Sequence, residues 1–300
     1  MGSHLHKAKV VKNDEFYTSY EDIEKELIHY KNCFDNKIVY CNCDFDWSNF
    51  VKFFNDVKID WNIKEVINTG SDFSNDQNLR LLKKADIVVT NPPFSLFREY
   101  VATLVKYDKT FLIMGNCGAA TNRDIFPLIK NDKIWIGLNR ASDFTDQEGN
   151  SVKLGNVVWY TNLFKADKRN LVLTEKYDPA KYPKYDNYDA IEVSRIRDIP
   201  CDYGGVMAVP VTLLSDWRCD IIDVVGAPQP GCHGETAPKH GYRDFWCQRQ
   251  DGSLTGRGGY QTRYSPFIEM NDGKRNILTD GKKELQAVYK RVFIKLKQKD

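Results

Sequence analysis

Four consecutive residues, Asn91-Pro92-Pro93-Phe94, are the part of this sequence best suited to chemistry, and they follow an apolar run that ends at Thr90. The carboxamide oxygen of Asn91 and the carbonyl of Pro92 can each accept one N–H of a planar amino group, which turns its nitrogen lone pair toward an electrophile. The two prolines fix φ and stiffen this loop. The Phe94 ring can stack on a heterocycle that carries the amino group. The pattern indicates methyl transfer from a sulfonium to an exocyclic nitrogen.

The same four residues could form an ordinary turn, because Pro-Pro ends a strand and Asn is a common turn residue. Their setting favours a site. A buried strand is expected over residues 85–90 and an amphipathic helix over 96–106. A loop between two such elements lies at the carboxyl edge of an open α/β sheet, where ligands bind.

The elements that would position this loop alternate between strands and helices. Apolar runs predict the strands, and apolar residues at helical spacing predict the helices. The expected strands are 38–41, 65–67, 85–90, 111–114, 133–138 and 157–161, and the expected helices are 21–30, 47–55, 96–106 and 121–130. This order indicates an α/β fold with a mostly parallel, Rossmann-like sheet and helices on both faces.

The length of 300 residues allows a catalytic domain and a smaller second unit. Residues 1–10 are expected to be disordered or tag-derived, since Gly2-Ser3-His4 is typical of an expression remnant. The catalytic domain is expected over residues 11–165. The alternation of strands and helices then stops, so residues 166–300 are expected to form a smaller, irregular unit.

Basic residues gather in this second unit, although the net charge of the chain is only +2. From residue 239 to residue 299 there are 14 Lys and Arg against 6 Asp and Glu, a surplus typical of contact with nucleic-acid phosphates. For residues 295–299 a solvated basic tail is an equal alternative. Within the glycine- and aromatic-rich segment 231–267, four arginines are predicted to contact DNA at guanine edges or phosphates: Arg243, Arg249, Arg257 and Arg263.

The sequence predicts neither a metal site nor a membrane location. Its eight cysteines include no C-x2-C pair, which favours free thiols over zinc ligands or disulfides. No apolar stretch approaches the roughly 20 residues of a membrane span, and the N-terminus lacks the apolar core of a signal peptide. A cytoplasmic protein is expected.

Five blocks carry a resemblance to a known family: residues 16–18, 39–44, 71–73, 86–100 and 182–191. They are similar to the EcoRI-type adenine-specific DNA methyltransferases over most of residues 6–210. The resemblance implies S-adenosylmethionine as the methyl donor and the N6 amino group of an adenine in double-stranded DNA as the acceptor. It further implies a monomer that uses no metal and has a cognate restriction endonuclease as a possible partner. The second unit would then be the target-recognition region.

Transferred position by position, the resemblance assigns catalysis to Asn91, Pro92, Pro93 and Phe94. It assigns the cofactor site to Phe16, Tyr17 and Thr18 at the methionine end, to Cys41, Asn42 and Asp44 in the first loop, and to Asp72 and Phe73 near the adenosyl base. This first loop lacks the Gly-x-Gly of most methyltransferases, as it does in the EcoRI-type enzymes. The acidic ribose ligand usual after the second strand is not evident after residues 66–68.

An adenine inside a duplex must be flipped out to reach a methyl donor. Phe94 is predicted to stack on the flipped base, and Trp159 or Tyr160 is predicted to cover its opposite face. For Trp159, core packing is an equal alternative. Three other functions fit the same residues. They are methylation of cytosine N4, methylation of an amino group in RNA or of a protein glutamine, and a catalytically silent DNA-binding module.

Overall fold

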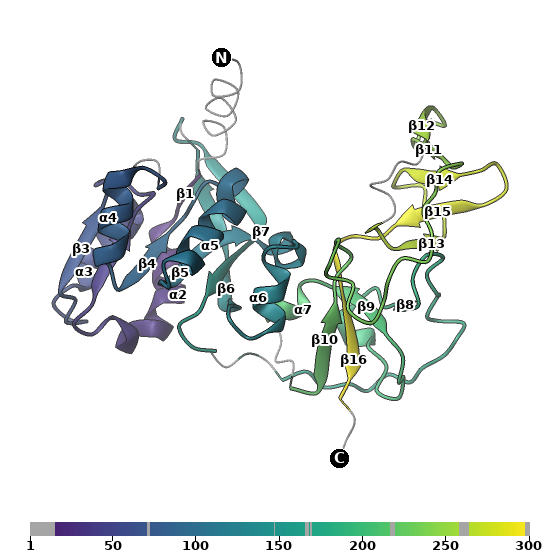
Figure 1. The fold of residues 1–300 in the computed structure, drawn as a ribbon, viewed down its shortest axis with the longest axis horizontal. Helices are drawn as coiled ribbons and strands as arrows, with labels where there is room; N and C mark the ends of the chain where they lie inside the picture. Colours follow the sequence, from purple (N-terminus) through teal and green to yellow (C-terminus); the bar gives the residue numbers. More distant parts are fainter. Residues whose placement is uncertain are drawn as a thin grey trace. The chain divides into compact units, whose positions relative to one another are not determined.

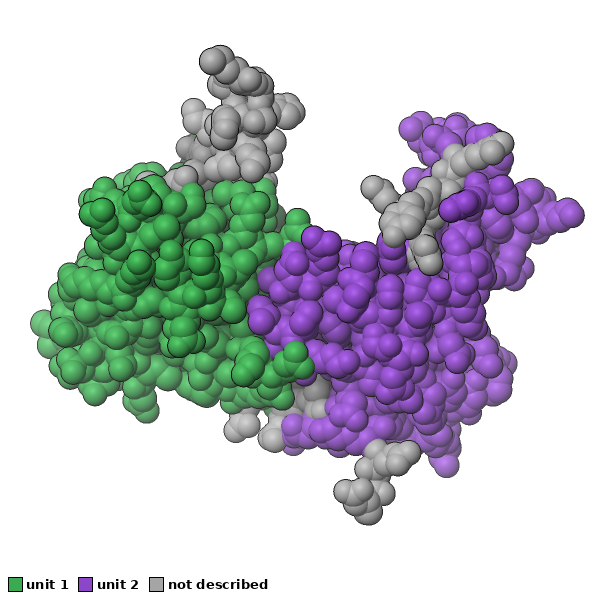
Figure 2. All heavy atoms as spheres, in the orientation of Figure 1, with its two compact units in different colours: residues 1–119, 131–168 green, residues 120–130, 169–300 purple. Residues whose placement is uncertain are grey.

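The computed structural model describes residues 16–70, 73–146, 148–165, 168, 170–216, 220–257 and 264–297. The chain forms two compact units (Figure 2). Unit 1 comprises residues 1–119 and 131–168, and unit 2 comprises residues 120–130 and 169–300. The division expected at residue 165 differs from this one mainly in the segment 120–130, which belongs to unit 2.

Unit 1 is built on a seven-stranded sheet in the order β1-β6-β7-β5-β4-β2-β3 (Figure 1). The strands are β1 (Tyr17–Thr18), β2 (Ile38–Cys41), β3 (Glu65–Asn68), β4 (Ile87–Thr90), β5 (Thr110–Asn116), β6 (Trp135–Thr145) and β7 (Ser151–Thr161). Strands β3, β2, β4 and β5 pair in parallel, whereas β7, β6 and β1 add antiparallel ladders. The Rossmann-like α/β fold is confirmed. The expectation of a mostly parallel sheet is wrong, because β6 and β7 form a long hairpin.

Helices pack on both faces of this sheet. The helices among the described residues of both units are α2 (Tyr20–Leu27), η1 (Ile28–Phe34), α3 (Asn49–Val57), α4 (Asp76–Lys84), η2 (Phe94–Leu96), α5 (Phe97–Lys106), η3 (Cys117–Thr121), α6 (Phe126–Lys130), η4 (Ile196–Asp198) and α7 (Leu213–Asp216). Helices α2 and α3 share an apolar core with Val39, Val89 and Leu112. On the other face, α5 approaches β5 so closely that a Cβ on Gly115 would lie 2.5 Å from the Phe97 ring.

The helices of this region differ from the predicted ones in two places. Helix α4 was not expected from the sequence, because only Asn78 and Leu82 along it are buried. Its start is fixed by Asn75, whose side chain accepts from the Asn78 N–H at 2.8 Å. The helix expected over residues 121–130 is shortened to α6. Within the described ranges, every helix is too short or too polar to span a lipid bilayer.

Unit 2 is more regular than expected, since it contains two antiparallel-rich sheets. One has the order β10-β16-β9-β8 and the other β12-β11-β14-β15-β13. The strands are β8 (Ile191–Glu192), β9 (Met207–Pro210), β10 (Ile222–Gly226), β11 (Trp246–Gln248), β12 (Leu254–Arg257), β13 (Phe267–Glu269), β14 (Ile277–Thr279), β15 (Glu284–Ala287) and β16 (Arg291–Leu296). Residues 295 and 296 therefore belong to a strand, so the alternative of a solvated tail is wrong for them.

Candidate active site

Asn91 directly follows β4, at the carboxyl edge of the parallel half of the sheet. Its Nδ2 donates to the Phe16 carbonyl at 2.7 Å and to Thr18 Oγ1 at 3.4 Å. A backbone carbonyl can only accept, so the nitrogen of the carboxamide must face Phe16. The Asn91 Oδ1 atom is buried and accepts no hydrogen bond within the described part of the chain.

This unpaired oxygen is a chemical signal. A buried acceptor without a donor costs roughly 1–3 kcal/mol, and such atoms in folded proteins call for a specific explanation. Here the oxygen lies in a loop where Pro92 is buried and Phe94 is partly buried against the main core. The arrangement provides an oriented acceptor beside an aromatic ring, which is suited to a planar N–H donor.

The first loop, residues 42–48, is tied to the residue before Asn91. The Thr90 hydroxyl donates to Asp44 Oδ2 at 2.5 Å and accepts from the Cys43 N–H at 3.3 Å. Asn42 is almost fully buried, its Oδ1 accepts from the Tyr100 hydroxyl, and its carbonyl accepts from Thr69 Oγ1 at 3.0 Å. The loop holds its shape through these side chains without glycine.

Asp44 is the titratable group of the site. Burial raises the pKa of its carboxyl to about 7, and hydrogen bonds from Thr90 and Ser48 oppose that rise only in part. A buried carboxyl near neutral pKa responds strongly to any cation placed beside it.

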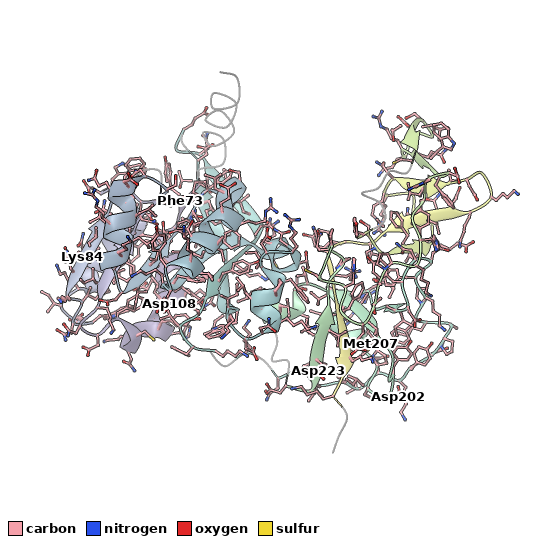
Figure 3. All side chains as sticks on the ribbon, viewed as in Figure 1. Phe73, Lys84, Asp108, Asp202, Met207 and Asp223 are labelled. Atoms are coloured by element: carbon pink, nitrogen blue, oxygen red, sulfur yellow. The ribbon has the colours of Figure 1, made fainter. Side chains whose placement is uncertain are left out.

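Of the residues predicted around an adenosyl base, Phe73 is described and Asp72 lies outside the described residues. Phe73, labelled in Figure 3, is buried. Its ring is in edge contact with Tyr100 at a centroid distance of 4.9 Å. Tyr100 thus joins Phe73 to Asn42. Nothing in the sequence indicated this role, because Tyr100 lies inside an amphipathic helix, where an aromatic residue normally packs in the core.

A carboxylate also lies near the end of β3, where the sequence offered none. The Nδ2 of Asn68, the last residue of β3, donates to Asp46 Oδ1 at 2.8 Å. Asp46 comes from the first loop and is exposed. Asp46 was not predicted from the sequence because it lies in another loop, 22 residues before Asn68.

The prediction that Trp159 or Tyr160 covers a flipped base is wrong. Both side chains are fully buried, and Trp159 belongs to the main core. The Tyr160 hydroxyl donates to the Asn116 carbonyl at 2.8 Å. The alternative of core packing holds for Trp159, and Tyr160 is buried as well.

Of the four arginines predicted to bind DNA, Arg243 and Arg249 are exposed and form no ion pair within the described residues. Arg257 ends β12 and its side chain is not described, and Arg263 lies outside the described residues. A groove over the five-stranded sheet carries three carboxylates against Lys282, namely Glu269, Asp280 and Glu284. Phosphate contact is therefore disfavoured in that groove.

The block 182–191 organises unit 2. The Asp186 carboxylate accepts from Lys283, from Tyr242 at 2.8 Å, and forms a 2.8 Å contact with His240 Nε2. Asn187 is fully buried, donating to the Ser265 carbonyl at 2.7 Å and accepting from the Phe267 N–H at 2.9 Å. These two residues anchor the start and the end of the arginine-bearing segment.

Within the part of the chain that the structure describes, no three His, Cys, Asp or Glu side chains gather in a way that could hold a metal ion. One of the eight cysteines, Cys219, lies outside the described residues.

Comparison with known proteins decides the family. The model of the family described as adenine-specific methyltransferase EcoRI matches residues 4–70 and 55–297. The chain belongs to the EcoRI-type adenine-specific methyltransferases. It is 38% identical to the Type II methyltransferase M.EcoRI of Escherichia coli, over 74% of this chain and 88% of that protein. It is also 32% identical to M.MgeORF184P of Mycoplasma genitalium (75% of this chain, 87% of the relative) and 33% identical to M.MpnI of Mycoplasma pneumoniae (75% and 86%).

Membership of this family confirms the predicted class of enzyme, a site-specific DNA adenine methyltransferase. The cytosine, RNA and glutamine alternatives are not favoured. These matches assign no role to the individual site residues that were predicted from the sequence.

Proposed function

We propose that this methyltransferase transfers a methyl group from S-adenosylmethionine to the N6 amino group of an adenine flipped out of duplex DNA, with Asn91 and Phe94 acting on the base. The observation that carries the proposal is the buried Asn91 Oδ1. Among the described residues no donor bonds to this oxygen, while the Phe16 carbonyl holds the nitrogen of the same carboxamide. Such an oxygen is placed to accept one N–H of the target amino group, and the Pro92 carbonyl is the candidate acceptor for the other.

S-adenosylmethionine, when bound, supplies an electrophilic methyl group on a sulfonium. The residues of the chain act on the amino group. As its lone pair attacks, positive charge develops on the nitrogen, and the Asn91 and Pro92 oxygens stabilise that charge until the proton leaves to solvent. Asn42, Asp44 and Phe73 would line the cofactor side, with Asp44 providing negative charge for a cationic donor. The protein would act as a monomer, alongside a cognate restriction endonuclease.

The direct test is methylation by the purified chain. Duplex DNA of mixed sequence is incubated with S-adenosylmethionine carrying a labelled methyl group, and the nucleosides are separated. Label in N6-methyladenine at one recurring sequence supports the proposal. Label in N4-methylcytosine, in RNA or in a glutamine-containing peptide, with none in adenine, would refute it. Sequencing with modified-base detection then gives the target site.

Cofactor affinity is expected to increase with pH up to about 7. The buried Asp44 carboxyl keeps its proton below its raised pKa of about 7, whereas a cationic donor binds best to the ionised form. Binding below that pKa therefore releases a proton, and affinity changes by up to about tenfold per pH unit. Calorimetric titration at several pH values up to about 7 measures how steeply the cofactor affinity rises with pH. Asp44→Asn should bind more weakly and without the slope. An equal slope in that variant would assign the proton to another group.

Phe94→Ala is expected to weaken capture of the flipped base, and Phe94→Tyr to retain most activity, because stacking on an aromatic face is worth roughly 1–3 kcal/mol per base. Base capture is measured with 2-aminopurine at the target position, whose fluorescence rises when the base leaves the stack. Equal damage from Tyr and Ala would show that Phe94 does not act by stacking.

Arg243→Ala and Arg249→Ala are expected to weaken DNA binding, because both side chains are exposed and unpaired within the described residues. Loss of a phosphate contact lowers the affinity for all DNA sequences and reduces the slope of log affinity against log salt concentration by about one. Loss of a guanine contact instead lowers the specificity at one base position by roughly 1–3 kcal/mol. Binding is measured at several salt concentrations on target and single-mismatch duplexes. Arg80→Ala, on the exposed side of α4, is the matched control. If both variants behave like it, the segment is not the DNA reader.

A further inference from the structure

The two-residue strand β1 lies beside the catalytic loop although the residues involved are more than 70 positions apart in sequence. Three contacts hold it there. It pairs with β6, opposing Tyr17 to Thr145 and Thr18 to Phe144. The Ser19 N–H donates to the Asp143 carbonyl at 3.0 Å. On its other side, Asn49 Nδ2, at the start of α3, donates to the Thr18 carbonyl at 2.8 Å.

The Thr18 hydroxyl has one partner as a donor and another as an acceptor. It donates its single proton to Met114 Sδ at 3.2 Å. Its lone pairs are then left to accept, and Asn91 Nδ2 lies 3.4 Å away. The Phe16 carbonyl accepts the other hydrogen of the same amide nitrogen at 2.7 Å. Both hydrogens of the Asn91 carboxamide are thus directed at β1 and the residue before it.

This double contact determines which end of the Asn91 side chain is available to a ligand. A carboxamide rotated by half a turn would place Oδ1 against the Phe16 carbonyl, two acceptors facing each other with no proton between them, and the Thr18 hydroxyl could donate to Oδ1 only by giving up its bond to Met114. The observed orientation instead leaves Oδ1 as the atom without a donor. Without β1, rotation of this amide would meet no such penalty.

We infer that Thr18 and Asn49 are positioning residues for methyl transfer: through β1 they hold the Asn91 carboxamide with its oxygen directed to the target amino group. This inference rests on the proposed function. It gives Thr18 a role different from the cofactor contact expected from its sequence, and it gives a role to Asn49, which no motif marked.

The test separates rate from binding. Thr18→Val removes the hydroxyl at nearly constant volume, and Thr18→Ser restores it. For Thr18→Val we expect the single-turnover methylation rate at saturating S-adenosylmethionine and DNA to fall by about tenfold, the effect of one lost hydrogen bond in the transition state, with the cofactor Kd unchanged. Thr18→Ser should recover the rate. Thr145→Val makes the same change on the exposed partner of Tyr17 and should leave the rate at the wild-type value.

Asn49→Asp is the independent second variant. It keeps the side-chain shape and suits the first turn of α3, but a carboxylate cannot donate to the Thr18 carbonyl. It should lower the rate as Thr18→Val does, again with the cofactor Kd unchanged. A wild-type rate in both variants overturns the inference, as does a weakened cofactor Kd with a normal saturated rate in Thr18→Val. A wild-type protein that methylates no adenine would refute the proposed function itself.

Discussion

Asn91→Ala is expected to lower the single-turnover methylation rate by on the order of a hundredfold or more, the typical loss when a positioned transition-state acceptor is removed. Cofactor binding should change little, because the Asn91 side chain is held by Phe16 and Thr18 and its oxygen faces away from them. The rate is measured with saturating S-adenosylmethionine and target duplex, and the cofactor Kd by calorimetry.

Asn170→Ala is the matched control for this prediction, since Asn170 is exposed and belongs to unit 2, whereas Asn91 belongs to unit 1. It should have the wild-type rate. Near-normal turnover in Asn91→Ala would show that the unpaired oxygen has no part in the reaction.

Glu192→Ala is expected to be the most destabilising single change in unit 2. The Glu192 carboxylate is buried and accepts from Arg291 Nη2 at 2.5 Å, from Arg291 Nε at 3.1 Å, and from the Tyr185 hydroxyl. Removing it leaves the buried Arg291 charge without a carboxylate, with only the Tyr289 carbonyl still accepting from Nη1 at 3.1 Å, and such a loss costs roughly 3–5 kcal/mol. Urea unfolding measures the loss in free energy of unfolding.

The control for this second prediction is Glu175→Ala, which removes an ion pair between two exposed side chains, Glu175 and Lys181. Exposed pairs contribute little, because water and salt screen them. Glu192→Ala should therefore be much less stable than Glu175→Ala. Similar stabilities for the two variants would show that burial does not make the Glu192–Arg291 pair important.

The parts of the molecule that the sequence predicted are those encoded by local pattern. Strands β2, β4 and β5 are continuous apolar runs buried on both faces, so their positions follow from composition. The loop at Asn91 was recognisable because the residue types that bind a planar amino group stand next to one another in the sequence. Helix α4 and the strands of unit 2 were missed because they are short or largely polar, and such segments carry too few apolar residues to show a period.

The parts that the sequence did not predict depend on tertiary contacts. Nothing local to residues 16–18 indicates that their backbone binds the Asn91 amide, and nothing local to Asn68 indicates that it holds Asp46. Likewise the burial of Trp159 follows from the pairing of β7 between β5 and β6. These contacts join residues that are distant along the chain, and a single sequence does not show which distant residues pair with each other.

The anchoring of unit 2 by Asp186 and Asn187 bears on how such enzymes diversify. The two residues fix both ends of the segment that carries Arg243 and Arg249, while those arginines lie on its exposed surface. If Arg243 and Arg249 read DNA as proposed, stability and specificity rest on different side chains. Substitutions on the exposed surface can accumulate without loosening the anchor, so a lineage can acquire a new target sequence in small steps, each of which leaves a folded enzyme.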